Sequence, residues 1–380
     1  MRKLLHVAVH GGINQNAGDT LLTVATRQLF DRYLGESDWH LHQAWEPLQA
    51  DEVNRERYDG IVVGGGGMLL PDQDGAEASV SGWQWNISLP DLEALQAPLI
   101  VFGIGYNRFR GQKDFAPVFG PHIRATAEKA AFFGVRNLGS AQALYPYGIA
   151  GLSMQPCPTT CLWQLYPEIA LEAQQHDAYG PRVLGINIAM DRSNLRFPDG
   201  LWRAVIVALI QAARHWRAEG WHIKVLCHKP GDMAIVSPLV NAGITPTVTR
   251  LWDVGPRVIL HAYTATDVVV GIRGHAQLIP FGLRKRIISL ITHDKLGWFL
   301  EDVGLASRGV DVHASASIAD DLAATLHGVA EEDTLAAKIA GNTAQDTAWR
   351  TTCTNMFHIA GILAPTSGYS PRLRFVQQTI

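Results

Sequence analysis

An arginine and a histidine stand two positions apart in the segment GIRGHAQLIPFG, residues 271–282, with Gly274 between them. The segment continues the apolar run VVVGI, which is typical of a buried strand, and leads into a helical pattern. A guanidinium supplies a fixed positive charge, and an imidazole is well suited to proton transfer near neutral pH. Arg273 and His275 are therefore candidates for holding an anion and for moving a proton.

Two further cations and one further histidine follow strand-like segments. Arg136 in VRNLGS comes after a short apolar run, and Lys295 in HDKLG comes after RIISLIT. An arginine at a strand end can bind a carboxylate or a phosphate through two parallel hydrogen bonds, although a lone arginine is commonly a surface residue. The segment CHKPGD places His228 where it could contact a sugar or a phosphate, or lie in a solvated loop.

Two segments of small residues also follow strands. GGGG, residues 64–67, comes after the apolar run GIVV and lacks both the dinucleotide-binding spacing and the Lys-Ser/Thr pair of a P-loop. We expect a glycine loop there, with Gly65 and Gly66 close to a ligand or to another backbone segment. NQNAGD, residues 14–19, can present helix N–H groups to an anion, or form a turn with Asp19 as the N-cap.

The elements that must position these residues alternate between strands and helices. LLHVAVHGG and APLIVFGI have the pattern of strands, and DTLLTVATRQLFDRYL has that of an amphipathic helix. The alternation pauses in a Pro-containing polar segment, residues 151–181, and restarts with RVLGINIAM. This rhythm predicts an α/β protein with two Rossmann-like domains facing a cleft. Ligands of such sheets bind beyond the carboxyl ends of strands, where every polar segment above falls.

The same pattern predicts where the domains begin and end. We expect an N-terminal Rossmann-like domain over residues 1–165 and a C-terminal one over residues 180–330, which carries the Arg-x-His segment. The Ala-rich remainder, residues 331–380, is expected to be a helical tail that is long enough to pack back on the first domain.

The composition of the 380-residue chain excludes several classes of protein. A formal net charge of -3, without a basic face or tail, argues against nucleic-acid binding. The four cysteines lack metal-site spacing and favour a reduced, cytoplasmic setting. No apolar stretch reaches the roughly 20 residues of a membrane span. The G-x-S-x-G motif is absent and carboxylate pairs do not gather at strand ends, which argues against a serine hydrolase and a glycosidase.

Taken together, these segments resemble the polysaccharide pyruvyl transferase family, from about residue 10 to residue 310. The family's order is matched by Gly18-Asp19, DGIVVGGGGML, VFGIGYN, VRNLGS and the long segment that runs from GIRGHAQLIPFG to HDKLGWFLEDVGL. The last segment is the most specific. Cys157 stands where the family commonly has an acidic residue before a proline, and Asn137 stands where an aspartate is usual.

The resemblance implies a glycosyltransferase-B-like fold and a reaction of exopolysaccharide or cell-envelope biosynthesis. The donor would be phosphoenolpyruvate, the acceptor a sugar of a glycan or a glycolipid, and the product a cyclic pyruvate ketal. By the match to the Arg-x-His segment, His275 would be the general acid, with Arg273 and Arg136 holding the donor's carboxylate and phosphate. Lys295 would add charge at the phosphate. This chemistry requires no metal, nicotinamide or other cofactor.

The remaining candidate residues would complete the cleft. Gly65 and Gly66 would offer N–H groups to the donor or the acceptor, and Asn16, Asp19 and His228 would face the acceptor. A lipid-linked acceptor would place the enzyme peripherally at the inner face of the membrane.

Two other functions stay open. The first is a nucleotide-sugar-dependent glycosyltransferase of the same fold, for which a carboxylate pair that holds a ribose is expected; HDKLGWFLED offers Glu301 and Asp302 but no clear ribose motif. The second is a sugar-binding or scaffold protein without catalysis, and the presence of both Arg273 and His275 argues against it.

Overall fold

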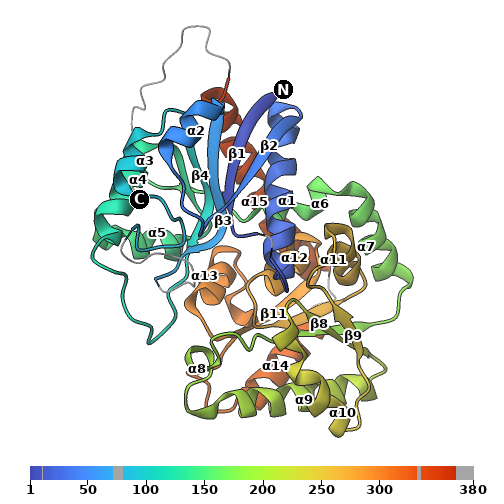
Figure 1. Cartoon of the computed structure of the whole chain (residues 1–380). Helices are drawn as coiled ribbons and strands as arrows, with labels where there is room; N and C mark the ends of the chain where they lie inside the picture. The colour runs from blue at the N-terminus through green and yellow to red at the C-terminus, as the bar shows by residue number, and fades with distance from the viewer. Residues whose placement is uncertain (11, 72–79, 332–334, 365–380) are drawn as a thin grey trace.

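In the computed structural model, the described residues are 1–10, 12–71, 80–331 and 335–364. They form two six-stranded sheets in which the paired strands are parallel (Figure 1). Helices pack on both faces of each sheet. The predicted α/β class is therefore confirmed.

The first sheet is built from the first 154 residues. Its strands are β1 (Arg2–Ala8), β2 (Ser37–Gln43), β3 (Gly60–Leu69), β4 (Leu99–Tyr106), β5 (Ala130–Val135) and β6 (Ser153–Met154). The helices between them are α1 (Ala17–Leu34), α2 (Ala50–Glu56), α3 (Leu89–Ala94), α4 (Phe119–Lys129), α5 (Leu138–Leu144) and the 3₁₀ helix η1 (Tyr145–Tyr147).

Three short helical segments and then the second sheet follow. The connecting helices are η2 (Pro158–Cys161), α6 (Leu162–Leu165) and α7 (Pro167–Tyr179). The strands are β7 (Val183–Asn187), β8 (His222–Cys227), β9 (Thr247–Arg250), β10 (Val268–Gly271), β11 (Arg286–Ile291) and β12 (Gly309–Asp311). The helices are α8 (Ser193–Arg196), η3 (Pro198–Gly200), α9 (Trp202–Ala218), η4 (Pro230–Ile235), α10 (Val236–Asn241), α11 (Pro256–Thr264), α12 (His275–Gly282), α13 (Asp294–Asp302), η5 (Ala306–Arg308), α14 (Ile318–Glu331) and α15 (Leu335–Ile362).

Each sheet reverses its strand order beside a central strand. The orders are β2-β1-β3-β4-β5-β6 and β12-β11-β10-β7-β8-β9. The connections leave on opposite sides at such a reversal, which opens a crevice beyond the carboxyl ends of the strands. The loops that follow β1 and β8 meet, because the amide of Ala17 donates to the carbonyl of His228 (3.3 Å). The carboxyl edges of the two sheets therefore face each other.

Helix α1 runs along the first half, and its N-terminal end reaches the second half beside α11 and α12 (Figure 1). Leu21 and Ala25 pack with Tyr263 of α11 in the second half. Leu29 and Phe30 pack on the first sheet. Apolar residues four positions apart thus give α1 one continuous apolar side along its length, which fixes the position of its N-terminus at the cleft.

The glycine run belongs to a strand and does not form the loop predicted from the sequence. Strand β3 extends through all four glycines. A Cβ atom at Gly64 would lie 2.3 Å from the carbonyl oxygen of Phe102 in β4, and one at Gly66 would lie 3.2 Å from Leu22 of α1. Gly64 and Gly66 also have φ angles of 128° and 101°, which favour glycine. The glycines therefore let β4 and α1 approach β3 closely, which is one of the two alternatives that the sequence leaves open.

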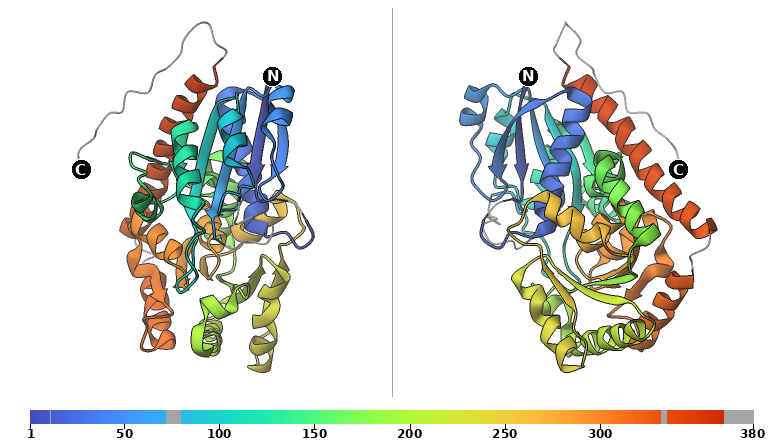
Figure 2. Two further views of the ribbon diagram at one scale, coloured as in Figure 1. Left: turned by 60° about the vertical axis from the view of Figure 1, so that its left-hand side comes forward. Right: turned by 90° about the vertical axis from the view of Figure 1, so that its right-hand side faces the viewer.

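The last helix, α15, runs along the outside of the molecule (Figure 2). Met356 and Ile359 pack in the core of the first half. Gln345 donates to the carbonyl of Phe281 in α12 (2.5 Å), so the same helix also contacts the second half. Of the predicted tail, residues 332–334 and 365–380 lie outside the described residues. The domain boundaries expected from the sequence stay predictions.

The longest apolar segment of the sequence, WRAVIVALIQAARHW, forms an ordinary core helix. In α9, Val205, Leu209 and Trp216 pack on the second sheet with Leu326 of α14. In the described part of the chain, no helix has the length and apolarity that a membrane crossing requires.

Candidate functional site

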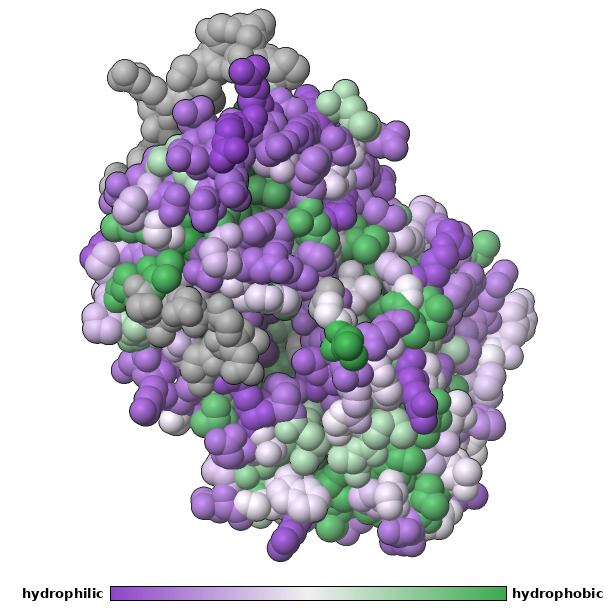
Figure 3. All heavy atoms as spheres, viewed as in Figure 1, coloured by the Kyte–Doolittle hydropathy of each residue, from purple (hydrophilic) through white to green (hydrophobic). Residues whose placement is uncertain are grey.

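The predicted site segments meet where the carboxyl edges of the two sheets face each other. His275 begins α12 after β10, Lys295 lies in the first turn of α13 after β11, and Arg136 follows β5. The loop after β1 adds Asn16 and Asp19 from the first half. In Figure 3 the molecular surface is hollowed where the two halves meet. The expectation that polar segments following strands lie at a cleft between two domains agrees with this arrangement.

His275 is held between the two halves. Its Nδ1 atom lies 3.9 Å from Oδ1 of Asp19, and its Nε2 atom lies 3.8 Å from Sγ of Cys157. A Cβ atom at Gly18 would lie 2.4 Å from the His275 ring, so only glycine allows α1 to come this near. The side chain is 8% exposed. Both ring nitrogens therefore lie near groups supplied by the first half.

The surroundings of His275 keep its imidazole neutral. Burial disfavours the charged form, and the charges of Arg136 and Lys295 act in the same direction, so its pKa is lowered to about 3. Burial also raises the pKa of Asp19, against the opposing charge of Lys229. In this state the imidazole can accept a proton, and it can donate one only when an anion offsets the two cations.

The guanidinium of Arg136 is enclosed without a protein partner. Its Nη2 atom is buried and has no hydrogen-bond partner among the described residues. Gly105 makes room for the group, because a Cβ atom there would lie 2.1 Å from Nε. Burial lowers the pKa of Arg136, although an arginine stays charged. Asp19 is the nearby carboxyl group whose charge favours the cation, but it makes no hydrogen bond to Arg136 among the described residues.

Lys295 is held by Asn107, which follows β4. Its Nζ donates to Oδ1 of Asn107 at 2.5 Å, and the carbonyl of Asn107 accepts from Nε2 of His293 at 3.1 Å. Burial and the charges of Arg136 and Arg196 lower the pKa of Lys295 well below its usual value. Lys295 thus lies near Arg136, and a bound anion would favour its charged form. Sequence reasoning missed Asn107, whose signal is its place at the end of VFGIGYN.

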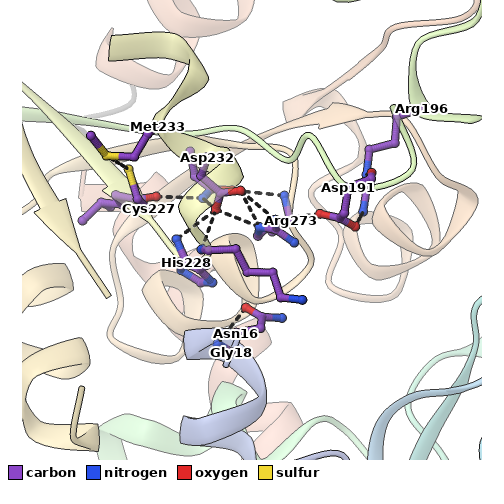
Figure 4. A network of polar contacts seen from close by, with 12 residues as sticks. Asn16, Gly18, Asp191, Arg196, Cys227, His228, Asp232, Met233 and Arg273 are labelled. Atoms are coloured by element: carbon purple, nitrogen blue, oxygen red, sulfur yellow. Dashed lines mark hydrogen bonds and ion pairs between the residues drawn. The ribbon is translucent and has the colours of Figure 1, made fainter. Parts of the chain in front are cut away.

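Arg273 is paired within the protein (Figure 4). Its Nε and Nη2 donate to the carboxylate of Asp232 at 2.8 and 2.6 Å, and Nη2 also lies 2.6 Å from Oδ1 of Asp191. Burial opposes the charge, but the two carboxylates outweigh it and raise the pKa of Arg273 above its ordinary value. The sequence predicts that Arg273 holds the donor, whereas these contacts favour a positioning role that ties the turn before His275 to η4.

Asp191 and Arg196 follow β7 and extend this ion-pair cluster. Nη2 of Arg196 donates to Oδ2 of Asp191 at 3.0 Å. Burial would raise the pKa of Asp191, but the charges of Arg273 and Arg196 outweigh it and bring the pKa below its usual range. No motif marks either residue, so sequence reasoning missed both. The available signal is their place after a strand of the second sheet.

His228 is buried, although Pro230 and Gly231 of the same segment are exposed, so a solvated position is wrong for the histidine itself. Its Nε2 lies 2.5 Å from the hydroxyl oxygen of Tyr263, and its main-chain amide donates to Asp232 at 2.9 Å. The Nδ1 atom is buried without a hydrogen-bond partner in the described part of the chain. His228 therefore holds η4 and α11 together beside Arg273, and its predicted contact with the acceptor stays a prediction.

Asn16, and not Asp19 as predicted, is the N-cap of α1. Its Oδ1 accepts from the amide of Gly18 at 3.2 Å, and its Nδ2 donates to Oδ2 of Asp19 at 3.0 Å. Figure 4 shows Asn16 and Gly18 below the Arg273 cluster. Because Asn16 performs the capping, the Asp19 carboxyl group is available to face His275.

A cavity of about 740 Å³ opens beside Arg136 and Lys295. Cys157 and Gly274 also line it, together with side chains of α12, α13 and α15. Gly65 and Gly66 are buried in β3 and do not line this cavity. Contact between their amides and a ligand stays a prediction.

The two departures from the family's pattern have different consequences. Asn137 is the N-cap of α5, and its Oδ1 accepts from the amide of Ser140 at 2.8 Å, as an aspartate oxygen could. Cys157 lies in the site itself, and burial raises the pKa of its thiol. Beside His275, the chain therefore has a neutral thiol where an acidic residue would carry charge.

Comparison with protein families gives one match. The model of the family described as polysaccharide pyruvyl transferase matches residues 16–294, which is the larger part of the chain. A search of curated protein sequences gave no match.

The solved structures to which the chain is similar include three sugar-nucleotide epimerases. The UDP-GlcNAc 2-epimerase of Neisseria meningitidis bound to UDP-GlcNAc has a TM-score of 0.53 and 10% identity, over 93% of this chain and 100% of that chain. The enzyme of Methanocaldococcus jannaschii with UDP-GlcNAc and UDP has values of 0.52 and 10%, over 87% and 92%. A putative UDP-N-acetylglucosamine 2-epimerase of Listeria monocytogenes has values of 0.52 and 11%, over 89% and 90%. These likenesses show the fold alone and confirm the predicted glycosyltransferase-B-like arrangement.

Proposed function

The chain belongs to the polysaccharide pyruvyl transferase family, and we propose that it transfers the pyruvyl group of phosphoenolpyruvate to two hydroxyls of one sugar in a glycan or a glycolipid. The products would be a cyclic pyruvate ketal and phosphate. The observation that carries the proposal is Arg136, whose Nη2 is buried without a hydrogen-bond partner among the described residues, near Lys295 and His275. Phosphoenolpyruvate combines a carboxylate and a phosphate, which such cations bind, with a methylene carbon that must receive a proton.

The reaction forms two C–O bonds at C2 of the donor and breaks one. A proton adds to the methylene carbon, which becomes a methyl group, and one sugar hydroxyl attacks C2. The second hydroxyl then displaces the phosphate. One hydroxyl proton balances the proton taken up by carbon, and the other leaves with the phosphate. We assign proton delivery to His275 and anion binding to Arg136 and Lys295, whose charges also stabilise the departing phosphate.

On the acceptor side, Asp19 is placed near the acid. Its Oδ1 lies 3.9 Å from Nδ1 of His275, and Asn16 holds its other oxygen at 3.0 Å. A carboxylate in this position can accept the proton of an attacking hydroxyl while His275 serves the methylene carbon. We therefore assign Asp19 and Asn16 to the acceptor side. The expectation that no metal or cofactor takes part stays a prediction.

Binding of phosphoenolpyruvate is expected to take up a proton from solution. In the empty site the pKa of His275 is about 3, because of burial and the charges of Arg136 and Lys295. The donor's negative charges offset those cations and raise the pKa of the imidazole. His275 then binds a proton as the donor binds. The affinity for the donor should therefore increase as the pH falls through the pKa of His275 in the complex.

Isothermal titration calorimetry in two buffers of different ionisation enthalpy measures this proton uptake. The His275→Gln variant is the matched control, because the donor's own phosphate titrates in both proteins while the imidazole is present in only one. Equal uptake by the wild type and the variant would contradict the assignment of His275.

The alternative glycosyltransferase needs carboxylates that are available to a ribose. Asp302 already accepts a hydrogen bond from the amide of Leu138 at 2.9 Å and so links α13 to α5. This contact gives Asp302 a structural role.

Product analysis tests the proposed function. After incubation with phosphoenolpyruvate and a panel of sugars, mass spectrometry should show one sugar heavier by a pyruvylidene group. In thermal-shift measurements, phosphoenolpyruvate should stabilise the protein and UDP-GlcNAc should not. Stabilisation by UDP-GlcNAc alone would favour a glycosyltransferase, and no response to either compound would favour a binding or scaffold protein.

A further inference from the structure

The cavity beside the proposed donor site is larger and more apolar than the donor requires. Its volume is about 740 Å³, of which a three-carbon donor fills a small part. Arg136 and Lys295 are its cations, and Asp302 is the carboxylate in its wall. Aliphatic and threonine side chains dominate the remaining wall, with Phe299 as its aromatic residue.

The polar side chains of this wall are mostly engaged with the protein. Asp302 accepts from the amide of Leu138, and Asn137 accepts from the amide of Ser140. The hydroxyl of Thr347 donates to the carbonyl of Thr343 at 2.8 Å, as is usual within a helix. A sugar needs hydrogen-bonding partners for its hydroxyls, and these walls have few to offer beyond the cations. The larger part of the cavity therefore suits an apolar group.

Three helices from distant parts of the second half and the C-terminal region form the apolar wall. Leu278 comes from α12, Phe299 from α13, and Ala344 and Ala348 from α15. Ala344 and Phe299 both pack against the apolar cluster that contains Phe281 and Leu300, which places α15 against α12 and α13. The outer helix α15 thus closes one side of the cavity, and the exposed Thr347 lies at its rim.

We propose that this cavity receives a hydrocarbon chain that is joined to the acceptor sugar, beside the donor at Arg136 and Lys295. The inference rests on the proposed function, since that function places the donor next to the cavity. Two features support it: the apolar wall continues directly from the two cations, and the cavity is larger than a donor bound at those cations would fill. The acceptor would therefore be a glycolipid rather than a free glycan.

Binding of a neutral alkyl glycoside in the presence of saturating phosphoenolpyruvate tests the proposal. Octyl β-glucoside, kept below its micelle-forming concentration, is compared with methyl β-glucoside by calorimetry. We expect the octyl compound to bind at least roughly tenfold more tightly, since each buried methylene adds affinity. The Thr347→Trp variant should lose this difference, because the indole takes the place of the chain.

Thr354 provides a matched control on the same helix. It is exposed and does not line the cavity. Its hydroxyl donates to the carbonyl four residues earlier, that of Arg350, at 3.1 Å, in the same way as the hydroxyl of Thr347 donates to Thr343. The Thr354→Trp variant should keep the wild-type preference for the octyl compound. Loss of the preference in both variants would point to a general effect on α15 and overturn the proposal.

Octanoate separates an acceptor chain from a free anionic amphiphile. If octanoate binds and phosphoenolpyruvate displaces both octanoate and octyl glucoside, the chain occupies the donor's place and the proposal is wrong. If phosphoenolpyruvate binds but octyl glucoside shows no preference over methyl glucoside, the proposal is also wrong, while the donor assignment stands. Failure of phosphoenolpyruvate to bind would instead overturn the proposed function, and with it the acceptor that this inference assumes.

Discussion

Replacement of His275 by glutamine is expected to lower the turnover of phosphoenolpyruvate by about 10²–10⁴-fold, the usual contribution of a general acid. Glutamine fills much of the space of the imidazole beside Gly18 and keeps a polar group near Cys157. It cannot carry a proton to the methylene carbon. The binding of phosphoenolpyruvate should persist, because the cations remain, so the loss appears in kcat.

Release of inorganic phosphate measures turnover, and calorimetry measures donor binding. Arg136→Gln should give the opposite result, with donor binding strongly weakened because the unpaired guanidinium is lost. Arg214→Gln, on the exposed side of α9, is the control for removing a positive charge elsewhere. Turnover by His275→Gln within a few-fold of the wild type would sink the general-acid assignment, whatever the outcome for Arg136.

The position of the site can be predicted from the sequence because of one topological rule. Parallel strands place their carboxyl ends at a common edge, so side chains that directly follow apolar runs must gather there. His275 and Lys295 follow such runs in the second sheet, and Arg136 follows one in the first sheet. The three come together because the carboxyl edges of the two sheets face each other. The apolar runs themselves are visible because both faces of these sheets are buried, which makes the strands almost continuously apolar.

The pairing of the charges cannot be predicted in the same way. Arg273 binds Asp232 and Asp191, which lie 41 and 82 positions earlier, on loops that follow two other strands. A sequence pattern describes each residue by its neighbours along the chain. It does not predict which of several carboxylates on different loops will pair with a given guanidinium. Lys295 and Asn107 pose the same problem, since they come from different halves. The sequence also does not predict that Nη2 of Arg136 lacks a hydrogen-bond partner in the described part of the chain.

The glycine run illustrates a different limit. Four consecutive glycines indicate close approach of another group, but the sequence does not tell a ligand from a backbone. In the structure, the approaching groups are the carbonyl of Phe102 and the side chain of Leu22. The glycine run therefore has a structural role. It lets α1 lie close to β3, and α1 in turn places Gly18 against His275.

Replacement of Asp232 by asparagine is expected to destabilise the protein by about 3–5 kcal/mol, the usual effect of removing one partner of a buried ion pair. Asp232 is fully buried and accepts from Nε and Nη2 of Arg273 and from the amides of His228 and Lys229. Asparagine keeps the shape of the side chain but removes the fully buried one of the two carboxylates that pair with Arg273, and Asp191 remains as the other. The free energy of unfolding in urea, followed by tryptophan fluorescence, measures the effect.

The double variant Asp232→Asn, Arg273→Met shows whether the loss comes from the weaker compensation of the Arg273 charge. Replacing both members of a buried pair by neutral groups is often close to neutral, so the double variant should recover part of the stability that Asp232→Asn loses. Asp191→Asn is the matched control, because Asp191 contacts the same guanidinium but its side chain is 38% exposed. This variant should lower the free energy of unfolding by roughly 1 kcal/mol or less. A double variant less stable than Asp232→Asn would mean that Arg273 contributes through contacts other than this pair. If instead stability recovers while turnover stays low, Arg273 serves catalysis by fixing the turn that precedes His275, which is the positioning role that its two carboxylate partners imply.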